Sequence, residues 1–189
     1  MNLLLNNIQK IITLTGEEQE LLLSSFEERS LKKKEFLLRE GEVCKGTAFV
    51  IEGLLRTYSV DKNGFDHVIQ FAPPGWWTGD MYSYKTGRPA RLFIDALENT
   101  DYMWISKNDL ESLYLKIPKL ERFFRILAEN SLISHQYRLV NFLSLPAVER
   151  YKSFCDQYPS LVGWLPQKQI ASYIGVTPEF LSKMLKENF

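Results

Sequence analysis

Side chains that could contact nucleic acid lie near the end of the 189-residue chain. Their spacing places them on one outward helix face: Glu179, Ser182, Lys183 and Lys186. A carboxylate there could accept from cytosine N4, and a lysine could donate to guanine or to phosphate. The alternative is a helical hairpin that only packs, with its charges on a solvated face. The segment 147–189 has five basic and four acidic residues, so charge does not decide between them.

Two helices joined by a short turn are predicted over Leu165–Leu185 to position these side chains. Pro166 suits a first helical position, and Gly175 lies where a helix commonly ends in the left-handed conformation. Thr177 followed by Pro178 indicates the start of the second helix, with a hydroxyl cap and a proline in the first turn.

Short apolar runs separated by turn residues extend from about Leu31 to Ser106 and predict a β-sandwich or β-roll. One hairpin is predicted at Asp61–Gly64, because an Asn-Gly pair supplies the positive φ angles of a tight turn. Its strands would be Leu54–Val60 and Phe65–Phe71. A short helix is expected before the strands, from about Gly16 to Phe26.

A helical period follows Ser106 and predicts a helix of about 25 residues from Pro118, ending at Pro146. One small domain rarely buries an apolar stripe of that length, so we expect a partner helix from a second subunit. Another helix is predicted over Ala147–Tyr158.

Composition argues against several other classes of protein. The two cysteines, Cys44 and Cys155, and the two histidines, His67 and His135, are too few for a disulfide framework, a haem site or a metal site. No apolar run reaches the ~20 residues of a membrane span, and the first residues lack a signal peptide pattern, so we expect a cytoplasmic protein without a membrane partner. The net charge is zero, so any basic surface must be local.

No motif for catalysis is present, since the sequence contains no nucleophile elbow, no phosphate-binding glycine loop and no metal-ligand spacing. Asp66 and His67 are adjacent, but neighbouring strand residues point to opposite faces. We therefore predict no catalytic residue, no metal and no enzyme activity.

The C-terminal motif resembles the helix-turn-helix of the Crp/Fnr family. The resemblance rests on Gln167, Ile170, Ala171, Ile174, Gly175, Val176, Thr177, Glu179, Leu181, Ser182, Lys183 and Leu185. It places Glu179 and Lys183 on the family's base-reading glutamate and arginine, while Pro178 replaces an arginine. The implied DNA-binding residues are Gln167, Lys168, Thr177, Glu179, Ser182, Lys183 and Lys186. Many family members continue into a winged hairpin. With Phe189 as the last residue, we expect either that the wing is short or absent or that the sequence is truncated before it.

The order of parts along nearly the whole chain also resembles this family and implies an α+β fold. The parts would be an N-terminal double-stranded β-helix (jelly-roll) sensor domain over residues 1–117, a long dimerisation helix over 118–143, and a small all-α helix-turn-helix domain over 144–189. The resemblance implies a one-component homodimeric regulator that binds double-stranded DNA and RNA polymerase under the control of an effector. The competing hypothesis is a small-molecule or nucleotide sensor that acts through protein contacts without binding DNA.

The effector region looks like a degraded version of the family's cyclic-AMP site. Gly79-Asp80-Met81 keeps a glycine and a shorter carboxylate, whereas Pro89 replaces a hydroxyl residue and removes a backbone donor. The implied effector residues are Gly79, Asp80, Arg88, Arg91 and His135, although ordinary solvated side chains would explain the arginines and the histidine. We expect no cofactor, with a cyclic nucleotide left as the alternative effector. An aromatic group could line a pocket or only pack: Trp76, Trp77, Tyr82 and Tyr84.

Overall fold

A computed structural model describes residues 3–188 of the chain, which form two compact units. The first unit comprises the segment ending at Ser59 together with Ile69–Leu127, and the second comprises Val60–Val68 together with the segment from Ala128 onward. One hairpin, formed by β4 (Leu55–Val60) and β5 (Asp66–Ala72), therefore has the base of both strands in the first unit and its tip in the second. The functional division at residues 117 and 143 remains a prediction.

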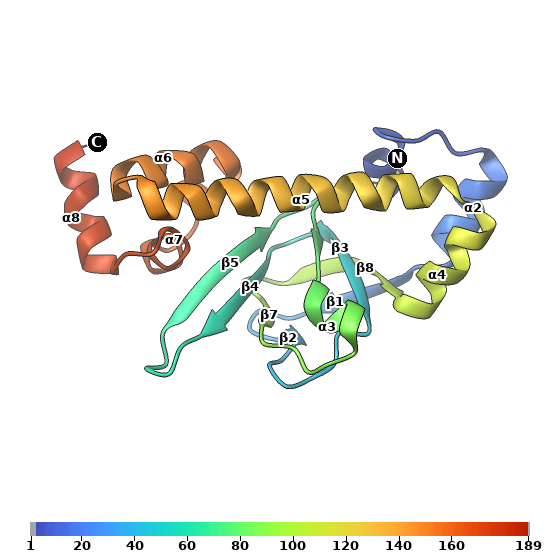
Figure 1. Cartoon of the computed structure of the whole chain (residues 1–189), viewed down its shortest axis with the longest axis horizontal. Helices are drawn as coiled ribbons and strands as arrows, with labels where there is room; N and C mark the ends of the chain where they lie inside the picture. The colour runs from blue at the N-terminus through green and yellow to red at the C-terminus, as the bar shows by residue number, and fades with distance from the viewer. Residues whose placement is uncertain (1–2, 189) are drawn as a thin grey trace. The chain divides into compact units, whose positions relative to one another are not determined.

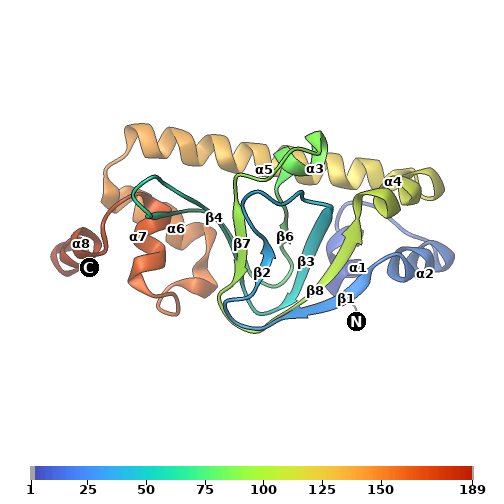
Figure 2. The ribbon, with the colours of Figure 1, turned by 90° about the horizontal axis from the view of Figure 1, so that it is seen from below.

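Two four-stranded sheets build the first unit, and every strand pair with a defined register is antiparallel. One sheet has the order β1-β8-β3-β6, from β1 (Glu27–Leu31), β8 (Thr100–Ser106), β3 (Gly46–Glu52) and β6 (Trp77–Thr78). The other has the order β2-β7-β4-β5, from β2 (Phe36–Leu38), β7 (Phe93–Ala96), β4 (Leu55–Val60) and β5 (Asp66–Ala72). Figure 2 shows β3 and β8 side by side. The predicted jelly-roll in an α+β fold is confirmed.

Helices pack against the first of these sheets and close its core. They are α1 (Leu3–Gln9), α2 (Gly16–Ser24), α4 (Lys107–Lys116) and the start of α5 (Lys119–Ser144), with α3 (Met81–Thr86) between strands β6 and β7. Leu4 and Ile8 of α1 are fully buried in a core that also contains Phe49, Trp77 and Phe123. The expected helix near Gly16 is confirmed as α2, with Thr15 and Glu18 forming a capping box.

The hairpin turn differs in detail from the prediction. Gly64 has a positive φ of 81°, but Lys34 is the one non-glycine with a positive φ among residues 3–188, so Asn63 does not share that conformation. The Asp61 carboxylate instead accepts the backbone N–H groups of Asn63 (2.8 Å) and Phe65 (3.0 Å). The turn is wider than a two-residue hairpin because this side chain replaces part of the backbone pairing.

The second unit contains the rest of α5 and the C-terminal helices. These are α6 (Ala147–Gln157), a short 3-10 helix over Pro159–Leu161, α7 (Gln167–Ile174) and α8 (Pro178–Asn188). Figure 1 shows α5 as one continuous helix, and its 26 residues agree with the predicted length. Within the second unit its large apolar side chains are exposed: Leu132 (58%), Ile133 (54%), Tyr137 (71%), Leu139 (58%), Val140 (59%), Phe142 (51%) and Leu143 (76%).

Candidate nucleic-acid interface

Helix α7 and the turn after it form as the sequence predicts, with one shift at the start. Pro166 is extended and lies one residue before the helix, so Gln167 takes the first helical position. Ile170, Ala171 and Ile174 are buried, which fixes the inner face of α7. Gly175 then ends the helix in the left-handed conformation at φ 72°.

Gly175 is also a point of close approach between the turn and helix α5. A β-carbon built on Gly175 would lie 2.3 Å from Cε2 of Phe142, a distance that no packed carbon pair tolerates. The positive φ and the neighbouring ring therefore both favour glycine at this position. With glycine at this position, the turn passes the Phe142 ring without displacing it.

Thr177 caps helix α8, as predicted from its type and position. Its Oγ1 accepts the backbone N–H of Phe180 (3.2 Å), and its carbonyl accepts the N–H of Leu181 (3.0 Å). Leu181 is fully buried and Met184 is 4% exposed, so these two side chains hold α8 against the rest of the motif. The opposite face of α8 is left to solvent.

A shallow depression lies along this outward face of α8. It is lined by Pro178, Glu179, Ser182, Lys183 and Lys186, so the structure brings together four of the seven predicted DNA-binding residues. The other three lie elsewhere on the motif, with Gln167 and Lys168 exposed in the first turn of α7 and Thr177 at the cap of α8. The Lys183 ammonium has one weak i,i+4 ion pair with Glu187 (3.8 Å), and both side chains are largely exposed.

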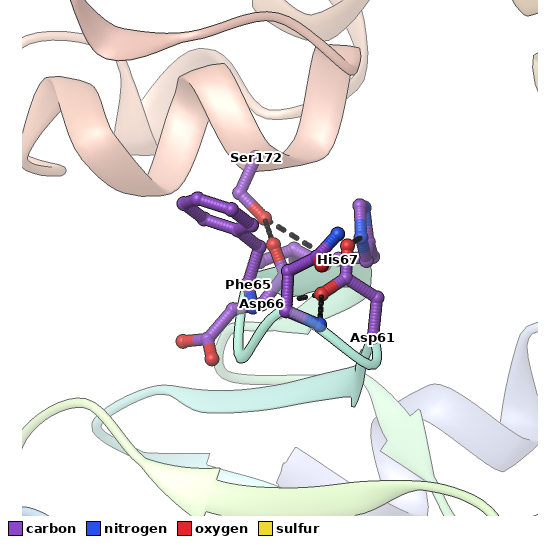
Figure 3. Close-up of polar contacts among 7 residues, drawn as sticks. Asp61, Phe65, Asp66, His67 and Ser172 are labelled. Carbon is purple, nitrogen blue, oxygen red and sulfur yellow. Dashed lines mark hydrogen bonds and ion pairs between the residues drawn. The ribbon is translucent and has the colours of Figure 1, made fainter.

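The tip of the β4–β5 hairpin is held by Ser172 of α7 (Figure 3). The Ser172 hydroxyl accepts from the backbone N–H of Val68 (3.0 Å) and donates to the carbonyl of Asp66 (2.5 Å). Both the tip and α7 belong to the second unit. Sequence reasoning missed this contact, because a serine on a helix gives no sign of a partner more than a hundred residues away.

Arg138 of α5 reinforces the same contact. Its guanidinium donates to the carbonyls of Val68 (2.6 Å) and Tyr173 (2.7 Å) and lies 3.9 Å from the centre of the Tyr173 ring. Burial lowers the pKa of the Arg138 guanidinium from its ordinary value, while the neighbouring Tyr173 and Tyr158 act in the opposite direction. The cation thus joins α5, α7 and the hairpin tip within the second unit.

Asp66 and His67 of the hairpin do not act as a pair. His67 points its Nε2 at the Asp61 carboxylate (3.0 Å) instead, as Figure 3 shows. This geometry agrees with the prediction that Asp66 and His67, as adjacent strand residues, are poorly placed to act together.

The predicted effector residues of the first unit are largely engaged by the protein itself. The Asp80 carboxylate is buried and accepts the N–H of Ser83 (2.9 Å) as the cap of α3, and the Ser83 hydroxyl donates to the carbonyl of Arg88 (2.6 Å). A β-carbon built on Gly79 would lie at ordinary contact distances from Gly46 and Thr47, so the space around it does not require a glycine. Asp80 and Arg88 are therefore connected through Ser83 in a structural network.

A cyclic phosphate does not fit this segment as it stands. Pro89 has no N–H, the N–H of Ala90 donates to the Glu42 carbonyl (2.7 Å), and the N–H of Arg88 points to the Thr86 hydroxyl (3.3 Å). A phosphate cradle needs free backbone donors beside a guanidinium, and these donors are already used. The side chains of Arg88 and Arg91 are exposed.

His135 and the aromatic group also have ordinary structural surroundings. His135 is exposed on α5 in the second unit, where its Nδ1 lies 2.7 Å from the Ser131 carbonyl oxygen. Trp77 and Tyr84 belong to two different core clusters, and Tyr82 is exposed, so these aromatic residues do not line one pocket. Burial raises the pKa of Tyr84 to about 12.

Residues 3–188 contain neither a metal-binding cluster nor a helix that could span a membrane. Within that range no three His, Cys, Asp or Glu side chains come close enough to hold a metal ion. In the same part of the chain, no helix has the length and apolar character needed to cross a bilayer.

The chain is similar in sequence to a known protein family and to known regulators. The family described as "Cyclic nucleotide-binding domain" matches residues 28–116. The chain is 27% identical to the transcriptional activator protein Anr of Pseudomonas protegens over 169 residues, covering 82% of this chain and 68% of that protein.

Two solved structures share the fold. FixK2 of Bradyrhizobium japonicum aligns with a TM-score of 0.74 at 21% identity, covering 86% of this chain and 83% of that one. A transcriptional regulator of the Crp/Fnr family from Eubacterium rectale aligns with a TM-score of 0.71 at 17% identity, covering 92% and 83%. The names of these relatives describe regulators rather than enzymes, in agreement with the prediction that the chain is not an enzyme.

Proposed function

We propose that the chain is a transcription regulator of the Crp/Fnr family and that it binds specific sites on double-stranded DNA through helices α7 and α8. The observation that carries this proposal is the division of α8 into two faces. Leu181 and Met184 are buried, while Glu179 and Lys183 are exposed along one depression. A helix with this pattern can enter a major groove without disturbing its own core.

The outward face offers both acceptors and donors to base edges. The Glu179 carboxylate can accept from cytosine N4, the Lys183 ammonium can donate to guanine O6 and N7, and the Ser182 hydroxyl can do either. Lys186, and Lys168 at the start of α7, are suited to phosphates, which set affinity and register rather than sequence preference.

A homodimer would double this interface. The exposed apolar side chains of α5 repeat every seven residues, as in Leu132 with Leu139 and Ile133 with Val140, which is the pattern of two helices packed side by side. A two-fold dimer with one α8 in each of two successive major grooves would read half-sites about 34 Å apart.

An effector or a protein contact in the β-roll would control DNA binding. The DNA-bound dimer would have RNA polymerase as its partner. The occupied donors around Ala90 and the missing N–H of Pro89 argue against a cyclic nucleotide as that effector. The effector would shift the population between two arrangements of the recognition helices.

The test is a selection of genomic fragments by the purified full chain, followed by gel shifts over a salt series. We expect the selected fragments to share a palindromic motif. In a Lys186→Gln variant, the plot of log binding constant against log salt concentration should have a slope smaller in magnitude by about one, because one phosphate contact is lost. Lys152→Gln, an exposed lysine of α6, is the matched control and should keep the wild-type slope. Failure to enrich any fragment at low or moderate salt would overturn the proposal in favour of a sensor that acts through protein contacts.

A further inference from the structure

Phe180 is a large apolar side chain on the exposed part of helix α8. It is 51% exposed, whereas the next residue, Leu181, is fully buried. Among residues 3–188 its ring has no aromatic ring partner. The packing of α8 is supplied by Leu181 and Met184, so the fold leaves much of the Phe180 ring without apolar cover.

The position of this ring on the helix relates it to the proposed base-reading face. At about 100° per residue, Phe180 lies about 100° from Glu179 and about 60° from Lys183 around the helix axis. Residues three apart are neighbours on a helix surface, so the ring flanks Lys183 at the edge of the face that lines the depression.

The backbone at this position is fixed before any ligand arrives. The N–H of Phe180 donates to the Thr177 hydroxyl (3.2 Å), and Pro178 restricts φ in the same turn. The ring therefore projects from a capped, pre-ordered first turn, the part of a recognition helix that contacts base edges. Such preorganisation lowers the entropy lost on binding.

The major groove contains one apolar group, the C5-methyl of thymine, and phenylalanine is among the side chains that contact it. We infer that Phe180 reads the C5-methyl of one thymine in each half-site, next to the base pair contacted by Lys183. This assignment rests on the proposed DNA binding and makes Phe180 a specificity-determining residue. Lys183, the next residue along this face from Phe180, and Lys186 beyond it favour nucleic acid over an apolar protein surface as the occupant.

The experiment uses the full chain and its selected DNA site, with each thymine replaced in turn by deoxyuridine. This replacement removes a methyl group and keeps every hydrogen-bonding group of the base. We expect the wild-type affinity to fall about fourfold per half-site at one thymine position, since burial of one methyl-sized group is worth about that factor. Phe180→Ala should bind the thymine and uracil sites equally, and Phe180→Leu should restore part of the preference.

Lys186→Ala is the matched control, because it should weaken binding to the thymine and uracil sites by the same factor. Phe180 is half-exposed, so Phe180→Ala should fold, and an unchanged melting temperature would establish this. If the wild-type chain binds every uracil-substituted site as well as the thymine site, or if Phe180→Ala keeps the preference, the inference is wrong while DNA binding stands. If no DNA site is selected at all, the proposed function fails and the inference fails with it.

Discussion

The hydroxyl of Ser172 in helix α7 donates a hydrogen bond to the carbonyl of Asp66, 106 residues earlier in the chain. The same hydroxyl accepts from Val68, so one side chain satisfies two backbone groups at the tip of the β4–β5 hairpin. The strands of this hairpin continue into the β-roll, while its tip belongs to the unit that contains the helix-turn-helix. The proposed sensor and the proposed DNA-binding motif are thus connected by a hairpin as well as by α5.

Replacing Ser172 with alanine should loosen the hairpin tip. The Val68 N–H and the Asp66 carbonyl would each lose a partner, at a cost of about 1–2 kcal/mol in the local opening free energy. Hydrogen exchange at the Val68 amide should be faster by about tenfold or more. Ser160→Ala, an exposed serine of the same unit, is the control. Equal exchange in both variants would show that the contact does not stabilise the tip.

Gly175→Ala should destabilise the helix-turn-helix more than a glycine replacement at another left-handed position. Gly163 also has a positive φ, of 79°, but has open space around it. Gly163→Ala should cost about 1 kcal/mol of unfolding free energy, from backbone strain alone. Gly175→Ala should cost about 1–2 kcal/mol more, because the Phe142 ring must move away. Urea denaturation measures both, and equal losses would contradict the close approach.

The hairpin turn should open in acid. The pKa of Asp61 lies below its ordinary value of 3.8, chiefly because His67 hydrogen-bonds to the carboxylate and secondarily because the Phe65 and Asn63 N–H groups do. A depressed pKa stabilises the fold above the ordinary value, and this contribution disappears as the pH falls through the depressed pKa. Amide protection at Phe65 should therefore drop in that pH range.

Two variants test this assignment of the acid transition. His67→Gln removes the largest cause of the shift, so the loss of protection should move to higher pH. Asp61→Asn keeps an oxygen acceptor without a titrating charge and should remove the pH dependence. A transition unchanged in Asp61→Asn would assign it to another group.

Leu139→Glu should convert a dimer into monomers. The side chain is 58% exposed in the single chain, at the middle of the apolar repeat on α5. A carboxylate buried between two helices without a partner would cost several kcal/mol. Light scattering during size-exclusion chromatography gives the molar mass. Ser131→Glu, on another side of the same helix, should stay dimeric, and a dimeric Leu139→Glu would place the subunit contact elsewhere.

Most helices and strands of the fold could be predicted from local sequence patterns, but the contacts between them could not. The Gly175 turn and the Thr177 cap were predicted correctly because each depends on the residue's own type and immediate neighbours. Helix α1 escaped prediction because its seven residues have no capping signal and depend on the burial of Leu4 and Ile8.

Side-chain partners were the least accessible to sequence reasoning. Asp80 resembles a ligand-binding carboxylate in sequence, yet it caps α3 and contacts Ser83 three residues later. Asn63-Gly64 predicted a tight turn, whereas the Asp61 side chain sets a wider one. In each case a short polar side chain bonds to nearby backbone, and composition alone does not show whether it will do so.

The most direct test of the account is a titration of the selected DNA site with every single base-pair substitution, for the wild-type chain and for Glu179→Ala. If α8 reads base edges, the wild-type chain should discriminate against wrong bases by about 1–3 kcal/mol at the pair that faces Glu179. Glu179→Ala should lose that discrimination at one position in each half-site and keep it elsewhere. A Glu179→Ala profile identical to that of the wild-type chain at every position would contradict the claim that this face of α8 contacts the bases.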